Sequence, residues 1–99
     1  MTALKRFYNF VASQPCVRCQ RQPVEVAHLR LFPSKKATDF MPRRQGIAAY
    51  SALPVCADCH RHAPDSVHAI GEAAWMDSLG KPPGWVYGLC ARMIAEALS

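Results

Sequence analysis

Four cysteines form the clearest chemical pattern in the chain. They lie in two C-x-x-C pairs that residues 20–55 separate, Cys16 with Cys19 and Cys56 with Cys59. A tight turn in such a pair aims two thiolates at one ion, and Zn²⁺ prefers four ligands of this kind in a tetrahedral arrangement. Two pairs complete a closed shell, so we predict a structural zinc ion and not a catalytic one. The alternatives are coincidence or a pair of disulfides, which a reducing compartment disfavours.

Three of the four histidines form a second pattern. His28 lies near the end of an expected strand, His60 directly follows the last cysteine of the second pair, and His68 opens an expected helix. Histidines that face one another in this way can hold a second metal ion, with water completing the shell. Such a site suits phosphodiester hydrolysis, because the ion stabilises charge on the phosphate and a neutral histidine accepts a proton from water. The alternative is that these three side chains are structural or ordinary polar residues, as we expect for His62 on the surface.

Positive charge is concentrated in the first half of the chain. The net charge is +5, from 12 Lys plus Arg against 7 Asp plus Glu, and residues 1–45 hold nine of the basic residues and two of the acidic ones. This imbalance favours a polyanionic partner such as DNA. We expect the basic residues of the loop 30–47 to contact phosphates. The alternative is that these residues only keep the loop solvated. Its basic residues are Arg30, Lys35, Lys36, Arg43 and Arg44.

The elements that must position these residues belong to an α+β domain. Apolar spacing predicts helices over 3–13, 67–79 and 85–98, and alternation predicts short strands over 23–29 and 48–55. Thr2 is the expected N-cap of the first helix, and Asp65 or Ser66 that of the second. Cys90, the fifth cysteine, is expected as a small buried residue of the last helix. The length of 99 residues fits a single domain, 1–99.

Three short motifs resemble the ββα-metal, or HNH, nuclease motif with zinc knuckles. They are Cys16-x-x-Cys19, Val26-Ala27-His28-Leu29 and Leu53-Pro54-Val55-Cys56-x-x-Cys59-His60. The string from His68 to Trp75 is also similar to small phage and prophage proteins of that superfamily. The resemblance covers roughly residues 14–79. It implies a small zinc-stabilised ββα-metal (HNH-like) core with flanking N- and C-terminal helices, the latter over 82–98.

The resemblance also implies roles for individual residues. His28 would be the general base or a metal ligand, His60 would be catalytic or structural, and His68 would bind a catalytic Mg²⁺, Mn²⁺ or other divalent ion together with His28. Ser51 stands where the family carries an asparagine, and its hydroxyl would orient His28. Ala27 stands where many members carry an acidic residue or a second histidine.

Two functions are therefore expected. The first is a metal-dependent DNA endonuclease or nickase that acts in phage recombination or DNA processing. The alternative is a non-catalytic zinc module that binds nucleic acid or a recombination or replication protein.

No apolar run approaches the roughly 20 residues of a membrane span. We do not expect residues 1–14 to act as a signal peptide, because charge and Asn9 interrupt their apolar residues, and we therefore expect a cytoplasmic protein. The oligomeric state stays open.

Overall fold

The computed structural model describes residues 2–29, 49–82 and 84–99. The whole of the basic loop 30–47 therefore lies outside the described residues. The predicted phosphate-binding residues that fall there are Arg30, Lys35, Lys36, Arg43 and Arg44.

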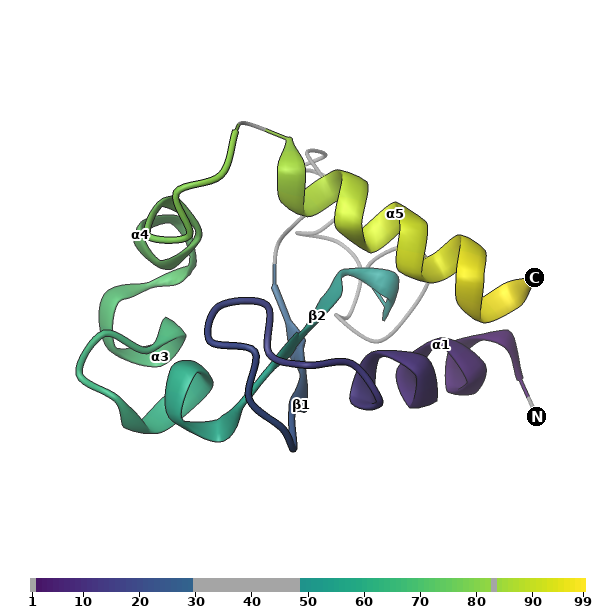
Figure 1. Ribbon diagram of the computed structural model, residues 1–99, viewed down its shortest axis with the longest axis horizontal. Helices are drawn as coiled ribbons and strands as arrows, with labels where there is room; N and C mark the ends of the chain where they lie inside the picture. The colour runs from purple at the N-terminus through teal and green to yellow at the C-terminus, as the bar shows by residue number, and fades with distance from the viewer. Residues whose placement is uncertain (1, 30–48, 83) are drawn as a thin grey trace.

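Two short antiparallel strands lie at the centre of the molecule (Figure 1). They are β1 (Glu25–His28) and β2 (Ala52–Val55), with Glu25 opposite Val55 and His28 opposite Ala52. Every residue of β2 is buried, whereas only Ala27 is fully buried in β1. Both predicted strands are confirmed but shorter. The two polar residues of β1, Glu25 and His28, lie at its two ends and are half-buried.

The N-terminal helix α1 (Ala3–Ala12) packs beside the hairpin. The hydroxyl of Thr2 accepts a hydrogen bond from the backbone N–H of Lys5 at 3.1 Å, which confirms the predicted cap. Phe7 and Val11 are four residues apart and therefore share one helical face, and both are fully buried. This helix anchors one end of the core.

The C-terminal helix α5 (Trp85–Leu98) lies alongside α1 and has the predicted bounds (Figure 1). Its inner face buries Cys90 and Met93. The thiol of Cys90 donates to the backbone carbonyl of Tyr50 at 3.0 Å, just before β2. Cys90 is therefore a packed core residue, as predicted, and it fastens α5 to the hairpin.

The segment after the second cysteine pair is more broken than predicted. It forms a π-helical turn η2 (Asp58–His62), then α3 (Val67–Ile70) and α4 (Glu72–Asp77). The single helix expected over 67–79 is a wrong prediction, because Gly71 between α3 and α4 has φ +90° and ψ 158°. That backbone conformation suits glycine and is incompatible with a continuous helix.

The start of α3 follows one of the two predicted caps. The hydroxyl of Ser66 accepts from the backbone N–H of Ala69 at 3.3 Å, and Ser66 is fully buried. Ser66, and not Asp65, is therefore the cap. Its position fixes where His68 emerges, one residue after the first residue of the helix.

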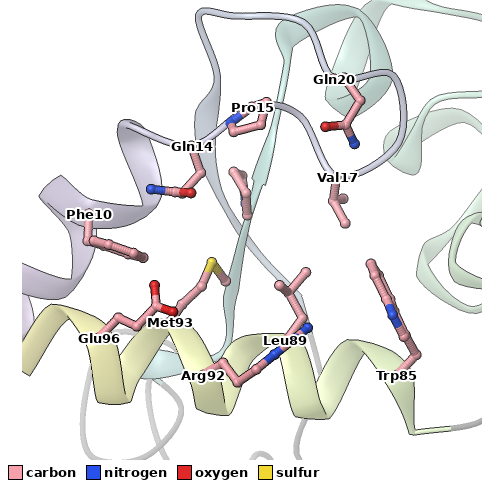
Figure 2. A pocket seen from close by; sticks show the side chains of 11 residues that line it. Phe10, Gln14, Pro15, Val17, Gln20, Trp85, Leu89, Arg92, Met93 and Glu96 are labelled. Atoms are coloured by element: carbon pink, nitrogen blue, oxygen red, sulfur yellow. The ribbon is translucent and has the colours of Figure 1, made fainter.

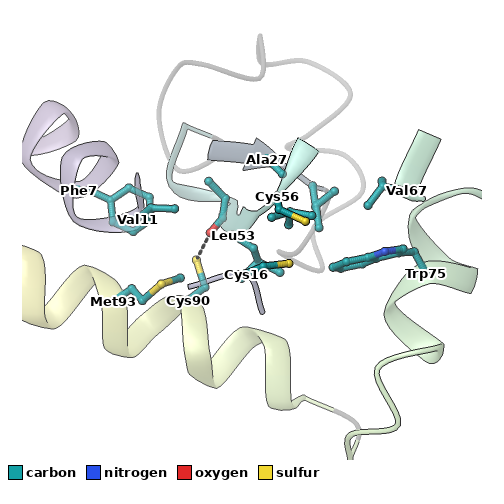
Figure 3. Close-up of a cluster of buried hydrophobic side chains, with 13 residues drawn as sticks. Phe7, Val11, Cys16, Ala27, Leu53, Cys56, Val67, Trp75, Cys90 and Met93 are labelled. Atoms are coloured by element: carbon teal, nitrogen blue, oxygen red, sulfur yellow. Dashed lines mark hydrogen bonds between the residues drawn. The ribbon is translucent and has the colours of Figure 1, made fainter. Parts of the chain in front are cut away.

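One hydrophobic core joins all these elements (Figure 3). The core runs from Phe7 and Met93 at one end to Trp75 of α4 at the other. It includes Cys16 and Cys56, and Cys59 packs against it. The two terminal helices are therefore part of the same core as the hairpin. Among the described residues, no helix is long and apolar enough to cross a membrane.

Candidate metal centre and histidine pocket

The first cysteine pair sits on a hydrogen-bonded turn. The backbone N–H of Cys16 donates to the carbonyl of Arg21, and that of Gln20 donates to the carbonyl of Cys16, both at 2.9 Å. Gln20 closes the turn with φ +66°. The N–H of Val17 donates to the carbonyl of Pro54 at 2.9 Å. This hydrogen bond fastens the turn Cys16–Cys19, the first knuckle, to β2. The pair is thus held beside the strand that leads into the second pair.

The second pair spans the end of β2 and the π-helical turn. Cys56 follows the strand directly, and its carbonyl accepts from the N–H of His60 at 2.9 Å. Arg18, inside the first knuckle, donates to the Asp65 carboxylate at 2.8 Å and to its backbone carbonyl at 2.9 Å. These contacts join the first knuckle to the segment between η2 and α3.

The four thiols converge on one point. Their sulfur atoms all lie within 4.8 Å of one another, with Cys19 Sγ and Cys56 Sγ 3.5 Å apart. A tetrahedral zinc ion with Zn–S bonds of about 2.3 Å separates its sulfurs by about 3.8 Å, so the donor set fits. All the cysteines are free thiols, which removes the disulfide alternative here. The cluster indicates a structural zinc site, as predicted, held by Cys16, Cys19, Cys56 and Cys59.

Two thiols of the cluster differ strongly in acidity. Burial raises the pKa of Cys16, but hydrogen bonds from the backbone groups of Cys19, Cys56 and Arg18 lower it by more, to about 7. Burial and the neighbouring thiols raise the pKa of Cys59 far above its ordinary value. Cation binding must displace the proton of Cys59, so the affinity of this site depends on pH.

Three histidines from three different elements line one open pocket. His28 comes from β1, His60 from η2 and His68 from α3, and the pocket volume is about 410 Å³. Glu72, at the start of α4, lines the same pocket. None of the four clustered cysteines lines it, so it is distinct from the thiolate cluster. Sequence reasoning passed over Glu72 as an early residue of the predicted helix.

The imidazole of His60 is held between two side chains. Its Nδ1 lies 2.8 Å from Oε1 of Glu25, and its ring meets that of His68 edge-on with 4.6 Å between centroids. Arg61 also donates to Glu25, through Nε at 3.1 Å and through Nη2. His60 first, and Arg61 second, hold the pKa of the Glu25 carboxyl below its usual range. Glu25 therefore orients His60 as a charged hydrogen-bond partner.

The imidazole of His28 is held by a residue outside the hairpin. The hydroxyl of Tyr8 in α1 lies 2.8 Å from Nε2 of His28, and the two rings are edge-on with 5.3 Å between centroids. Ser51, which was expected to orient His28, is buried. Its hydroxyl donates to the backbone carbonyl of Leu29, the residue that follows His28. Sequence reasoning missed Tyr8 because the first helix was read only for its apolar face.

Within the described residues, the four cysteines form the group of three or more candidate ligands that could hold a metal ion. The three histidines share a pocket but do not form such a group. His62 is exposed, as expected for a surface residue.

A second cavity, of about 340 Å³, lies between α1, the first knuckle and α5 (Figure 2). Phe10 and Trp85 form two of its walls, and Arg92 lies along the helix at its base. None of the predicted catalytic or metal-binding residues lines this cavity.

No family model, curated protein or solved structure matches this chain. The fold and the cluster by themselves define a small α+β protein with a two-stranded antiparallel hairpin and a four-cysteine metal site.

Proposed function

We propose that the protein is a metal-dependent phosphodiesterase that cleaves or nicks DNA, an endonuclease of the HNH type. One observation carries this proposal: His28, His60 and His68 line a single open pocket beside a closed thiolate cluster. A closed zinc site cannot activate water or bind a phosphate, so chemistry would belong to the pocket. The HNH-like spacing of the cysteines and histidines in the sequence gives the reaction type. A phage or prophage origin is part of the same proposal.

The pocket is lined by donor groups of the kinds that bind divalent ions. Imidazole nitrogens of His60 and His68 and the carboxylate of Glu72 are ligand types that first-row divalent ions accept. The contact between Glu25 and His60 is the arrangement that usually supports a metal-binding histidine, with a carboxylate on the second ring nitrogen. When bound, the ion would stabilise the charge that develops on the phosphate and on the leaving oxygen.

The protein's own residues would do the remaining work. His28, on the strand side of the pocket, is the general base that takes a proton from the attacking water. Glu25 fixes the ring of His60, and through it the position of the phosphate. Basic residues of the loop 30–47 would hold the DNA backbone without reading its sequence.

Cleavage of supercoiled plasmid tests the proposal. Zinc-loaded protein should nick or linearise the plasmid with Mg²⁺ or Mn²⁺, and His28→Ala should lower the rate about 100-fold or more, as expected for loss of a general base. His62→Ala is the matched control, since it removes an exposed histidine of η2 that does not line the pocket.

Two results would argue for the non-catalytic zinc module instead. One is the absence of metal-dependent cleavage on duplex, branched and single-stranded DNA. The other is salt-sensitive DNA binding that persists unchanged when both His28 and His68 are replaced by alanine.

A further inference from the structure

Tyr8 of α1 makes two hydrogen-bonding contacts with one hydroxyl group. Its oxygen lies 2.7 Å from the backbone carbonyl of Ala49 and 2.8 Å from Nε2 of His28. A tyrosine hydroxyl has one proton to donate, and a carbonyl oxygen can only accept. The proton of Tyr8 therefore points to Ala49, and the hydroxyl oxygen must accept from His28.

This proton count assigns the tautomer of His28. Nε2 of His28 must carry a proton in order to donate to Tyr8. In the neutral imidazole the other nitrogen, Nδ1, then holds the lone pair, and it is the only ring nitrogen able to accept a proton or to bind a cation.

We propose that Tyr8 is a positioning residue that holds neutral His28 as the Nε2–H tautomer and makes Nδ1 its reactive nitrogen. This inference rests on the proposed function only for its catalytic consequence, because the tautomer itself follows from the contacts. Tyr8 lies in α1, outside the 14–79 region of resemblance, and α1 packs against both β1 and β2. The N-terminal helix is then part of the site and not merely a flanking element.

Nuclear magnetic resonance of the histidine ring nitrogens tests the assignment directly. At about pH 8, above the ordinary histidine pKa, His28 of the zinc-loaded protein should show a protonated Nε2 and an unprotonated Nδ1. Tyr8→Phe keeps the aromatic ring and removes the acceptor oxygen, so the His28 signals should move to a mixture of both tautomers. Tyr87→Phe, at an exposed position of α5, should leave the His28 signals unchanged.

Cleavage supplies the second readout. Tyr8→Phe should lower kcat about 10- to 100-fold with little change in KM, the usual cost of losing a residue that orients an active histidine. An Nδ1–H tautomer in the unmodified protein would overturn the assignment, as would an unchanged tautomer in Tyr8→Phe. An altered tautomer with unchanged kcat would overturn the positioning role. The nitrogen spectra do not depend on cleavage, so failure of the inference is distinguishable from failure of the proposed function.

Discussion

Oε1 of Glu25 lies 2.8 Å from Nδ1 of His60, which joins the first strand to the turn that also carries Cys59. A carboxylate on the strand edge thus meets an imidazole one residue beyond a zinc ligand. The thiolate cluster and the histidine pocket share this turn, so the closed site positions one wall of the open site.

The pH dependence of stability should report the Glu25 contact. The folded-state pKa of Glu25 is depressed, so its contribution is present above the ordinary glutamate pKa and is lost as the pH falls through the depressed value. We predict that Glu25→Gln lowers the free energy of unfolding by about 0.5–1 kcal/mol near neutral pH, a modest value because the pair is partly exposed.

Urea unfolding of both proteins between about pH 7 and pH 4 measures this difference. The difference should shrink towards the acid end. Equal stability of Glu25→Gln and the parent at about pH 7 would show that the Glu25 carboxylate contributes no net stabilising interaction with His60 and Arg61.

Replacement of a clustered cysteine should remove both zinc and fold. Cys56→Ser is expected to lose the metal and the cooperative unfolding transition, because binding energy at a structural zinc site is largely folding energy. Cys90→Ala should keep one zinc ion per chain and lose only about 1–2 kcal/mol of stability, the cost of a small cavity and a weak hydrogen bond. Elemental analysis with circular dichroism measures both. One zinc ion per chain in folded Cys56→Ser would contradict the four-cysteine assignment.

Two glycines in helical regions should respond to alanine in opposite directions. Gly71→Ala forces a side chain onto φ +90° and should destabilise the protein by about 1–3 kcal/mol. Gly88→Ala, inside α5 with no atom within 4 Å of the added methyl, should be neutral or stabilise by about 0.5–1 kcal/mol. Thermal unfolding of the two variants compares them. Equal stability of Gly71→Ala and the parent would mean that the break between α3 and α4 is not required.

The sequence predicted an element well where a single local feature, such as apolar spacing, a capping hydroxyl or a cysteine pair, determines the structure. The bounds of α5 follow from its apolar spacing, the Thr2 cap from its hydroxyl, and the cysteine cluster from two spaced pairs. The helix break at Gly71 was missed because an isolated glycine is often tolerated inside a helix, and only its backbone angles distinguish the two cases.

The residues that orient the histidines could not be predicted in the same way. Glu25 meets His60 across 35 residues of sequence, and Tyr8 meets His28 across 20. Both contacts depend on how α1, β1 and η2 pack, which no local period encodes. The sequence contained one usable signal, since Glu25 lies in the same short predicted strand as His28 and is its only carboxylate.

Binding of Mn²⁺ to the zinc-loaded protein directly tests for a second metal site in the histidine pocket. Mn²⁺ prefers oxygen and imidazole ligands and does not compete for four thiolates, so it probes the pocket alone. We predict that Mn²⁺ broadens the ring signals of His60 and His68 at concentrations that leave the Tyr87 signals sharp. We also predict that His68→Ala abolishes this selectivity while zinc is retained. Equal broadening of all three residues, or the same selective broadening in His68→Ala, would contradict a second metal site in the histidine pocket.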